Sequence, residues 1–267
     1  MSSFALPGRT FRNQTPPQSG KPRNIRTTQF FWLDMAVPFT SVAGQNVIAN
    51  TNLEQFYLRV RGAWSDMTDV RARMFASATG IGLSTLPVPL LSQAGNSDLA
   101  FPMLYWRRPF DILPNSSLQG QFTNDGAEAA GVVVFFCERP DEDEEVTVQR
   151  TSQYELLLDL GLNGVLNSTG VATTQQLDYD ILIYGALSTS ESCTIKFLDT
   201  RLNRGWSSRQ LPIGAFAGIR ASGNVQPIIW YPTPYLLGKY SSIRAEYTNA
   251  GTETGKYVTF IGERILL

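Results

Sequence analysis

Residues 101–139 read FPMLYWRRPFDILPNSSLQGQFTNDGAEAAGVVVFFCER, and residues 226–264 read QPIIWYPTPYLLGKYSSIRAEYTNAGTETGKYVTFIGER. The two stretches align without insertion or deletion at a step of 125 residues, from Thr123 to Thr248. Both contain a proline–aromatic–proline succession, Ser-Ser followed by Leu or Ile, Thr-Asn-x-Gly, a β-rich segment and a final Glu-Arg pair. A period this long is a whole domain and exceeds any supersecondary repeat, so the sequence predicts two similar modules in tandem.

The length of the chain is sufficient for two such modules, and its composition argues against nucleic acid and membranes as partners. Each half of the 267 residues is long enough to bury a core of its own. The formal net charge of −1 disfavours nucleic acid as the main partner. No run approaches about 18 apolar residues, and the first 20 residues lack an apolar signal core, so we expect no membrane span and synthesis in the cytosol.

Histidine is absent from the sequence, which excludes serine or cysteine triads of the usual kind and most zinc sites. The spacing of the acidic residues does not favour paired-carboxylate chemistry. We therefore expect no catalytic residue, cofactor or metal, and we interpret Gly80-Ile81-Gly82 as a surface turn. Cys137 and Cys193 stand at non-equivalent positions of the two halves and are expected to be buried, reduced thiols.

Two segments lie outside the modules. Residues 1–27 carry five Lys or Arg side chains, many Pro and Gly, and no acid, which is typical of a floppy terminus or of an extended arm lying on a neighbouring subunit. The spaced apolar residues Phe4, Leu6 and Phe11 favour the arm. Residues 140–150 open with five consecutive acids after Pro140 and are expected to be a solvated linker. The alternatives for this linker are a calcium contact and a charge partner for the basic arm, between subunits of a ring.

The modules, residues 28–139 and 151–267, read as all-β. Apolar residues alternate with polar ones at period two, and no stretch sustains the spacing of a helix. Pro87 and Pro212 suit a sheet edge or the start of a strand better than the centre of a sheet. The strands expected ahead of the repeated stretch, paired between the halves, are 30–34 with 155–159, 53–63 with 179–183, 70–75 with 194–198, and 86–88 with 211–213.

The repeated stretch itself predicts a hairpin in each module. Residues 117–122 and 242–247 alternate strictly, and residues 131–137 and 256–262 return as β-rich strands. In the Thr-Asn-x-Gly turn between them, asparagine tolerates left-handed geometry and glycine supplies a positive φ. Short strands with regular turns favour a β-sandwich in each module, of jelly-roll type.

Two further motifs are repeated and are candidates for contacts. The aromatic pairs Tyr105-Trp106 and Trp230-Tyr231 either pack under the following link or offer a stacking surface to a sugar or a protein. The dipeptides that end the modules, Glu138-Arg139 and Glu263-Arg264, suggest an edge ion pair or a salt-bridged contact to the next module.

With these motifs, residues 101–139 and 226–264 resemble small β-sandwich virion proteins of tailed bacteriophages, as if two single modules were fused. The resemblance implies a non-enzymatic structural protein of the virion, made in the host cytoplasm. It would be a homo-oligomer that contacts capsid, portal or tail components as a collar, head-to-tail connector or decoration protein. Two alternatives stay open: a receptor- or carbohydrate-binding virion protein, and a tandem jelly-roll major capsid protein whose modules stand side by side. The duplication and the acidic linker depart from the single-module pattern.

Overall fold

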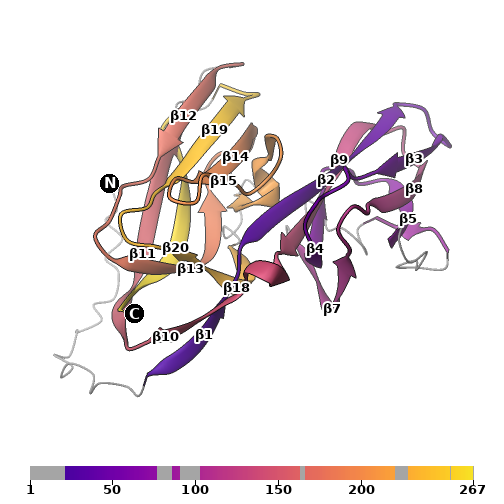
Figure 1. Ribbon diagram of the computed structural model, residues 1–267. Helices are drawn as coiled ribbons and strands as arrows, with labels where there is room; N and C mark the ends of the chain where they lie inside the picture. The colour runs from indigo at the N-terminus through magenta and orange to yellow at the C-terminus, as the bar shows by residue number, and fades with distance from the viewer. Residues whose placement is uncertain are drawn as a thin grey trace, which may run out of the picture.

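The computed structural model describes residues 22–76, 86–90, 103–162, 166–219, 228–252 and 254–266 (Figure 1). Over these residues the chain is all-β, as predicted, and two 3-10 helices of three residues each are the helical segments that they contain. The strands form two bodies that lie side by side, joined by a narrow two-stranded ribbon. Residues 1–21, which include Phe4, Leu6 and Phe11, and the Gly80-Ile81-Gly82 turn lie outside the described residues.

The first module contains two antiparallel sheets of four strands. One sheet has the order β2-β9-β4-β7 and the other has the order β3-β8-β5-β6, an arrangement consistent with a β-sandwich. The strands are β2 (Phe30–Thr40), β3 (Asn46–Asn50), β4 (Leu58–Ser65), β5 (Val70–Ala76), β6 (Val88–Pro89), β7 (Leu104–Ile112), β8 (Leu118–Asn124) and β9 (Ala129–Glu138).

The second module repeats this pairing order. Strands β11-β20-β13-β18 form one sheet and β12-β19-β14-β16 form the other, and the short strands β15 and β17 add to their edges. A 3-10 helix, η2 (Ile213–Ala215), follows β16. The strands are β11 (Arg150–Leu162), β12 (Thr169–Thr173), β13 (Asp180–Ser188), β14 (Cys193–Asp199), β15 (Arg204–Gly205), β16 (Leu211–Pro212), β17 (Gly218–Ile219), β18 (Ile229–Leu237), β19 (Ile243–Asn249) and β20 (Lys256–Leu266).

The register of the strands is also the same in the two modules. Val60 faces Cys137 between β4 and β9, and Ile183 faces Gly262 between β13 and β20. In both cases the next residue bulges out of the ladder. Val60 and Ile183 are 123 residues apart, whereas Cys137 and Gly262 are 125 apart. The step between equivalent residues is therefore not constant along the modules.

The variable step corrects one predicted pairing. The edge strands exist as expected, but Pro89 faces Arg71 and Pro212 faces Thr194. Val88–Pro89 is therefore the counterpart of Leu211–Pro212, two residues away from the pairing of 86–88 with 211–213. The step between equivalent residues is 125 at Trp32 and Leu157, 123 at Asn46 and Thr169, and 125 again at Tyr105 and Trp230. The shift of two residues therefore arises between the first two strands of the modules and is reversed by the strand that follows the edge strand.

The hairpin predicted within the repeated stretch is wrong. Strand β8 pairs with β3 and β5, whereas β9 pairs with β2 and β4, so consecutive strands lie in opposite sheets. β19 and β20 are divided in the same way. Phe122 and Phe135 reach the same core from the two facing sheets, so the chain crosses from one sheet to the other between them and does not turn back within one sheet. The repeated stretch spans the core of its module.

The predicted chemistry of the Thr-Asn-x-Gly turn is wrong too. Neither Asn124 nor Gly126 has a positive φ; Ala127 has it instead, at 58°. Asn124 is fully buried, and its side-chain amide exchanges two 2.8 Å hydrogen bonds with the backbone of Glu128. A Cβ on Gly126 would lie 2.4 Å from the Cβ of Asp69, and the equivalent glycine of the second module meets a serine side chain similarly. The asparagine is a buried connector, and the glycine allows close packing.

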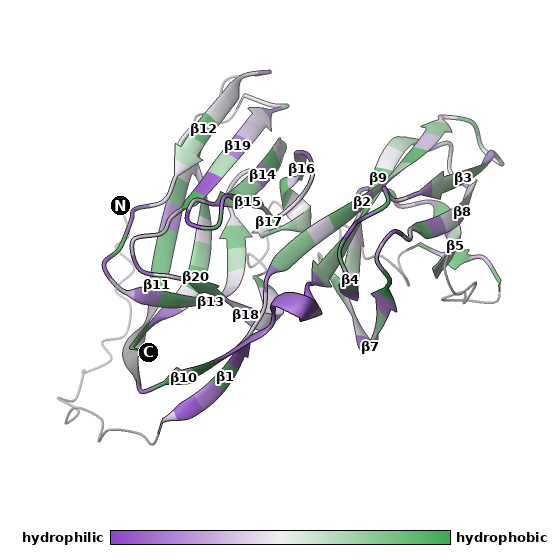
Figure 2. Cartoon of the chain, in the orientation of Figure 1, coloured by the Kyte–Doolittle hydropathy of each residue, from purple (hydrophilic) through white to green (hydrophobic). Residues whose placement is uncertain are grey.

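The expected arm and linker come together in one ribbon. Strand β1 (Arg23–Thr27) pairs antiparallel with β10 (Glu144–Val148), after the 3-10 helix η1 (Pro140–Glu142). The acids at 144 and 145 are exposed, as expected of a solvated segment, yet they belong to a strand. Figure 2 shows the mixed character of the ribbon, polar along most of β1 with apolar positions among them.

The apolar side of this ribbon packs on the second module. Val148 forms a small buried cluster with Leu182 and Ile265, and Ile25 and Val146 pack against it. Each of these side chains leaves water on docking, which stabilises the ribbon where it lies. The segments before and after the first module thus cover part of the outer surface of the second.

Candidate functional site: the surface between the modules

One face of the first module is buried by the second. Side chains alternate across β2, so that Leu33 points into the core of the first module while Trp32 points out of the β2-β9-β4-β7 sheet. An outward face is normally wet, yet Trp32 and Phe136 are both 0% exposed. They belong to a cluster that continues into the second module. The strand is apolar on both faces because both faces are covered.

Trp32 is the centre of this contact. Its ring stacks on Trp206, with 5.5 Å between centroids, and lies 4.8 Å from the ring of Phe216. Its indole Nε1 donates a 2.8 Å hydrogen bond to the carbonyl of Ala215, and its backbone N–H donates a 2.6 Å bond to the carbonyl of Trp206. The open edge of β2 is thereby bridged to Ser207 of the second module.

Phe30 extends the aromatic contact toward the ribbon. Its ring lies edge-on to Trp206 at 5.6 Å and to Tyr231 at 4.9 Å. Tyr231 in turn donates a 3.0 Å hydrogen bond to the carbonyl of Phe216. Burial raises the pKa of Tyr231 well above its ordinary value, so this hydroxyl stays protonated and remains a donor. The indole Nε1 of Trp32 and the hydroxyl of Tyr231 are thus paired in this contact, whereas the buried indole Nε1 of Trp206 has no hydrogen-bond partner.

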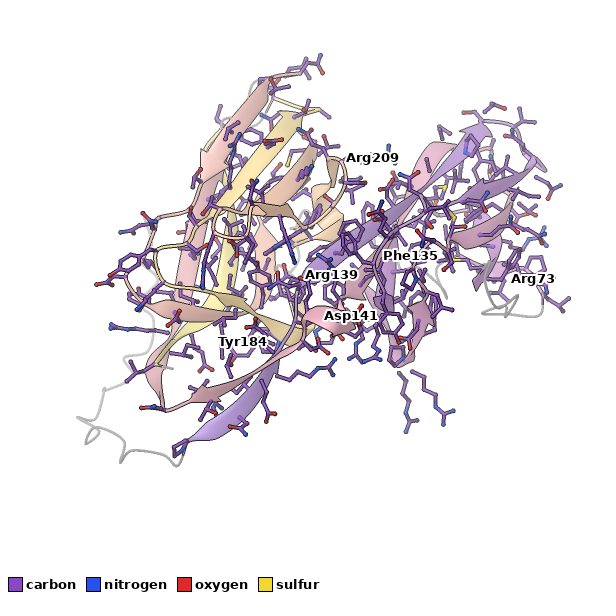
Figure 3. All side chains as sticks on the ribbon, in the orientation of Figure 1. Arg73, Phe135, Arg139, Asp141, Tyr184 and Arg209 are labelled. Carbon is purple, nitrogen blue, oxygen red and sulfur yellow. The ribbon has the colours of Figure 1, made fainter. Side chains whose placement is uncertain are left out.

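Two polar links border the aromatic cluster. Arg209 of the second module donates a 2.7 Å hydrogen bond from Nε to the Asp34 carboxylate of β2, and Figure 3 labels it on the side of the second module. At the other border, the Glu138 carboxylate is completely buried and pairs with Arg61 at 2.7 Å. The Thr233 hydroxyl of the second module donates a 2.6 Å bond to Glu138. These links fix the register of one module against the other.

The Glu-Arg dipeptides combine parts of the two predicted roles: both glutamates form ion pairs, but at the ends of interior strands, and the contact of Glu138 to the second module is a hydrogen bond from Thr233 and not a salt bridge. Glu138 makes the contact to the next module, whereas its counterpart Glu263 pairs with Arg23 of the ribbon at 2.8 Å and accepts a hydrogen bond from the Tyr184 hydroxyl. Burial, and secondly the hydrogen bond to Glu263, raise the pKa of Tyr184. The arginines stack instead on aromatic rings: Arg139 lies 3.7 Å from the ring centroid of Phe56, and the second module has the same contact.

The aromatic pairs are mostly packing residues. Tyr105 is partly buried against the contact cluster, and burial raises the pKa of its hydroxyl. Trp106 packs on Phe135 within the first module. Tyr231 is only 5% exposed, whereas Trp230 is 50% exposed. Of the four aromatic side chains, one is therefore open to a partner.

The basic arm and the acidic linker do pair, but within one chain. Arg26 of β1 forms a salt bridge with Asp143, and its guanidinium lies 4.0 Å from Glu138. The expectation of a clasp between subunits is not needed to explain these charges. Such half-exposed pairs contribute about 0–1 kcal/mol each, so the ribbon depends mainly on its apolar side.

The described residues carry no sign of metal or thiol chemistry. Cys137 and Cys193 are buried thiols that form no disulfide, as predicted, and burial raises the pKa of the Cys137 thiol so that it stays protonated. No group of three or more metal-ligating side chains occurs among the residues that the structure describes. The same residues contain no helix of the length and apolarity that crossing a bilayer requires.

Sequence reasoning missed the contact between the modules. A signal was present: residues 30–34 are apolar at four of five positions, so both faces of the strand are apolar, whereas in residues 155–159 the sequence alternates Glu155, Leu157 and Asp159 with two leucines. A strand that is apolar on both faces is buried on both faces. No family model matches the chain, and no curated protein is similar to it.

Proposed function

We propose that each module is a jelly roll, that the two arose by duplication, and that the chain is a non-enzymatic structural subunit of a bacteriophage particle. The observation that carries the proposal is the strand order. The first module has eight strands, and the second has the same eight plus the short strands β15 and β17. If the eight shared strands are numbered in sequence, one sheet reads 1-8-3-6 and the other 2-7-4-5 in both modules. Two four-stranded sheets interleaved in this way support a double Greek key, the architecture of many viral capsid domains.

Among the virion roles, the geometry best supports a tandem jelly-roll capsid subunit. The modules are fixed side by side by an aromatic contact, two polar links and a ribbon. A rigid pair of similar modules presents neighbours with two nearly equivalent surfaces, which suits a closed shell of many copies. A collar or head-to-tail connector forms a single ring and uses few copies, so copy number distinguishes these two roles from a shell subunit. A decoration protein instead adds to a shell that another abundant protein builds, so the presence of such a protein distinguishes that role.

A carbohydrate- or receptor-binding role has less support. Such a site requires aromatic rings open to the ligand, and three of the four side chains in the repeated aromatic pairs are packed inside. Trp230 is left, at a position where the other module uses its aromatic side chain for packing.

The test is the composition of the particles. Virions from a culture that produces this protein would be purified on a density gradient, and their proteins identified and quantified by mass spectrometry against the other particle proteins. A copy number that matches the shell supports the capsid subunit. A copy number that matches a single ring supports a collar or connector, and absence from the particles overturns the proposal.

A further inference from the structure

The outer face of the β11-β20-β13-β18 sheet has an apolar row formed by Leu157, Ile261 and Trp230; its two ends are exposed, while Ile261 between them is 4% exposed. Leu157 faces Ile261, and Gly185 faces both Ile261 and Trp230, so these residues lie in one line across the four strands. Leu157 is 60% exposed and Trp230 is 50% exposed. Tyr257, further along β20, is 42% exposed. Large apolar side chains grouped on one face mark an interaction site more often than scattered ones do.

The same row in the first module is the contact between the modules. There Trp32 faces Phe136, and Gly62 faces both Phe136 and Tyr105, in the same register. Trp32 is equivalent to Leu157, and it is 0% exposed because the second module covers it. The chain thus contains two copies of one docking face, of which one is occupied.

The edge strand beside the row also differs between the modules, because its outer edge is bridged in the first module and has no paired strand among the described residues in the second. β2 and β11 are both edge strands of their sheets. The N–H of Trp32 points out of the β2 edge and donates to the carbonyl of Trp206, forming a bridge to Ser207. No strand in the described part of the chain pairs with the outer edge of β11 at Leu157. An open edge next to apolar side chains is a template for another chain.

The partner that covers this row can be inferred from the surfaces that the contact between the modules leaves unused. The contact within the chain uses the outer face of the first module and, from the second module, the segment around β15, β16 and η2 at the β14 edge. What is left over is the part of the outer face of the second module that the ribbon does not cover, and the equivalent β5–β6 side of the first. That side carries Leu86, which is 70% exposed. In any one chain these two unused surfaces belong to different modules, so a second copy is needed to join them.

We propose that the row Leu157, Ile261 and Trp230 is the docking face for a second copy of this chain, and that it receives the β5–β6 side of that copy's first module. The inference deepens the proposed function and rests on its two-module architecture. The contact is heterologous: each copy gives one surface and receives another, so association proceeds head to tail. Such contacts close into a ring where the rotation permits and otherwise grow as a filament.

The first test is a matched pair of charge substitutions. Leu157→Asp places a charge in the row, and Val171→Asp places the same charge at a residue of nearly equal exposure, 58%, in the other sheet of the same module. Size-exclusion chromatography with light scattering over a concentration series is expected to show self-association weakened roughly tenfold or more by Leu157→Asp and unchanged by Val171→Asp. Equal behaviour of the two variants overturns the inference. Circular dichroism confirms that both are folded.

The second test identifies the surface that meets the row. The photo-reactive residue p-benzoylphenylalanine is placed at position 230, the full-length protein is irradiated, and the cross-linked peptides are identified by mass spectrometry. Cross-links to residues 28–139 of another copy support the proposal. Cross-links to the second module of another copy, which indicate a symmetric dimer, or to residues 1–27, which indicate that the amino-terminal segment covers the row, overturn it. A monomeric protein at all concentrations overturns it as well, while the particle composition still tests the proposed function by itself.

Discussion

Replacing Trp32 with alanine is expected to separate the two modules without unfolding either. Trp32 is fully buried, but it belongs to the cluster shared with the second module and not to the inner core of the first. Truncating a buried aromatic side chain of this size costs about 3–5 kcal/mol. The carbonyl of Ala215 also loses its indole donor at 2.8 Å, which adds about 1 kcal/mol. The loss is a large part of the 5–15 kcal/mol by which a whole domain is stable.

The assay is denaturation in urea followed by far-ultraviolet circular dichroism, combined with limited proteolysis in residues 140–149. Trp32→Ala is expected to split one cooperative transition into two and to expose the connection to protease. The matched control is Leu157→Ala, at the equivalent position of the second module. Since that side chain is 60% exposed, its removal is expected to change stability by less than about 0.5 kcal/mol. The reasoning is refuted if the curves of the two variants coincide.

Three further predictions concern single side chains. Gly126→Ala brings a Cβ to 2.4 Å from that of Asp69 and is expected to cost about 1–3 kcal/mol, lowering the melting temperature; an unchanged melting temperature contradicts the packing role. Glu138→Gln removes the charge from a buried ion pair and is expected to destabilise the protein by about 3 kcal/mol in urea, whereas wild-type stability would show that the pair is dispensable. Hydrogen bonds from the hydroxyl of Thr68 and from nearby backbone N–H groups lower the pKa of Glu128 below its ordinary 4.5, so its contribution is full above pH 4.5 and is lost as the pH falls through the lowered pKa. Glu128→Gln should therefore flatten the acid limb of a plot of stability against pH, and a parallel limb would refute this role.

The individual strands are readable from the sequence because burial alternates locally. In β8, Leu118, Gly120 and Phe122 point inward and the residues between them do not, which is a pattern of period two visible without any partner. The pairing of strands is not local. Nothing within residues 117–137 distinguishes a hairpin from two strands that lie in different sheets. The choice depends on distant partners, because β8 pairs with β3 and β5 and β9 pairs with β2 and β4.

The roles of single residues were harder to predict for a related reason. The sequence Asn-x-Gly looks the same whether the asparagine forms a turn or, like Asn124, makes hydrogen bonds inside a core. The contact between the modules depends on Trp32 meeting Trp206, residues 174 positions apart, which no local pattern encodes. The contrast between Trp32 and Leu157 at equivalent positions was visible, but its meaning needs the strand order.

The ribbon makes the folding of the amino-terminal segment a late event. Ile25 packs with a cluster that contains Ile265, which is synthesised 240 residues later. At typical translation rates of about 5–20 residues per second, roughly 10–50 s pass between the synthesis of Ile25 and that of Ile265. During that interval all strands of the first module have been synthesised, while the outer face that carries Trp32 and the strand β1 are still exposed to solvent. The ribbon can therefore take its final place only after the second module has formed, and its packing there hides the apolar side chains of Ile25 and Val146.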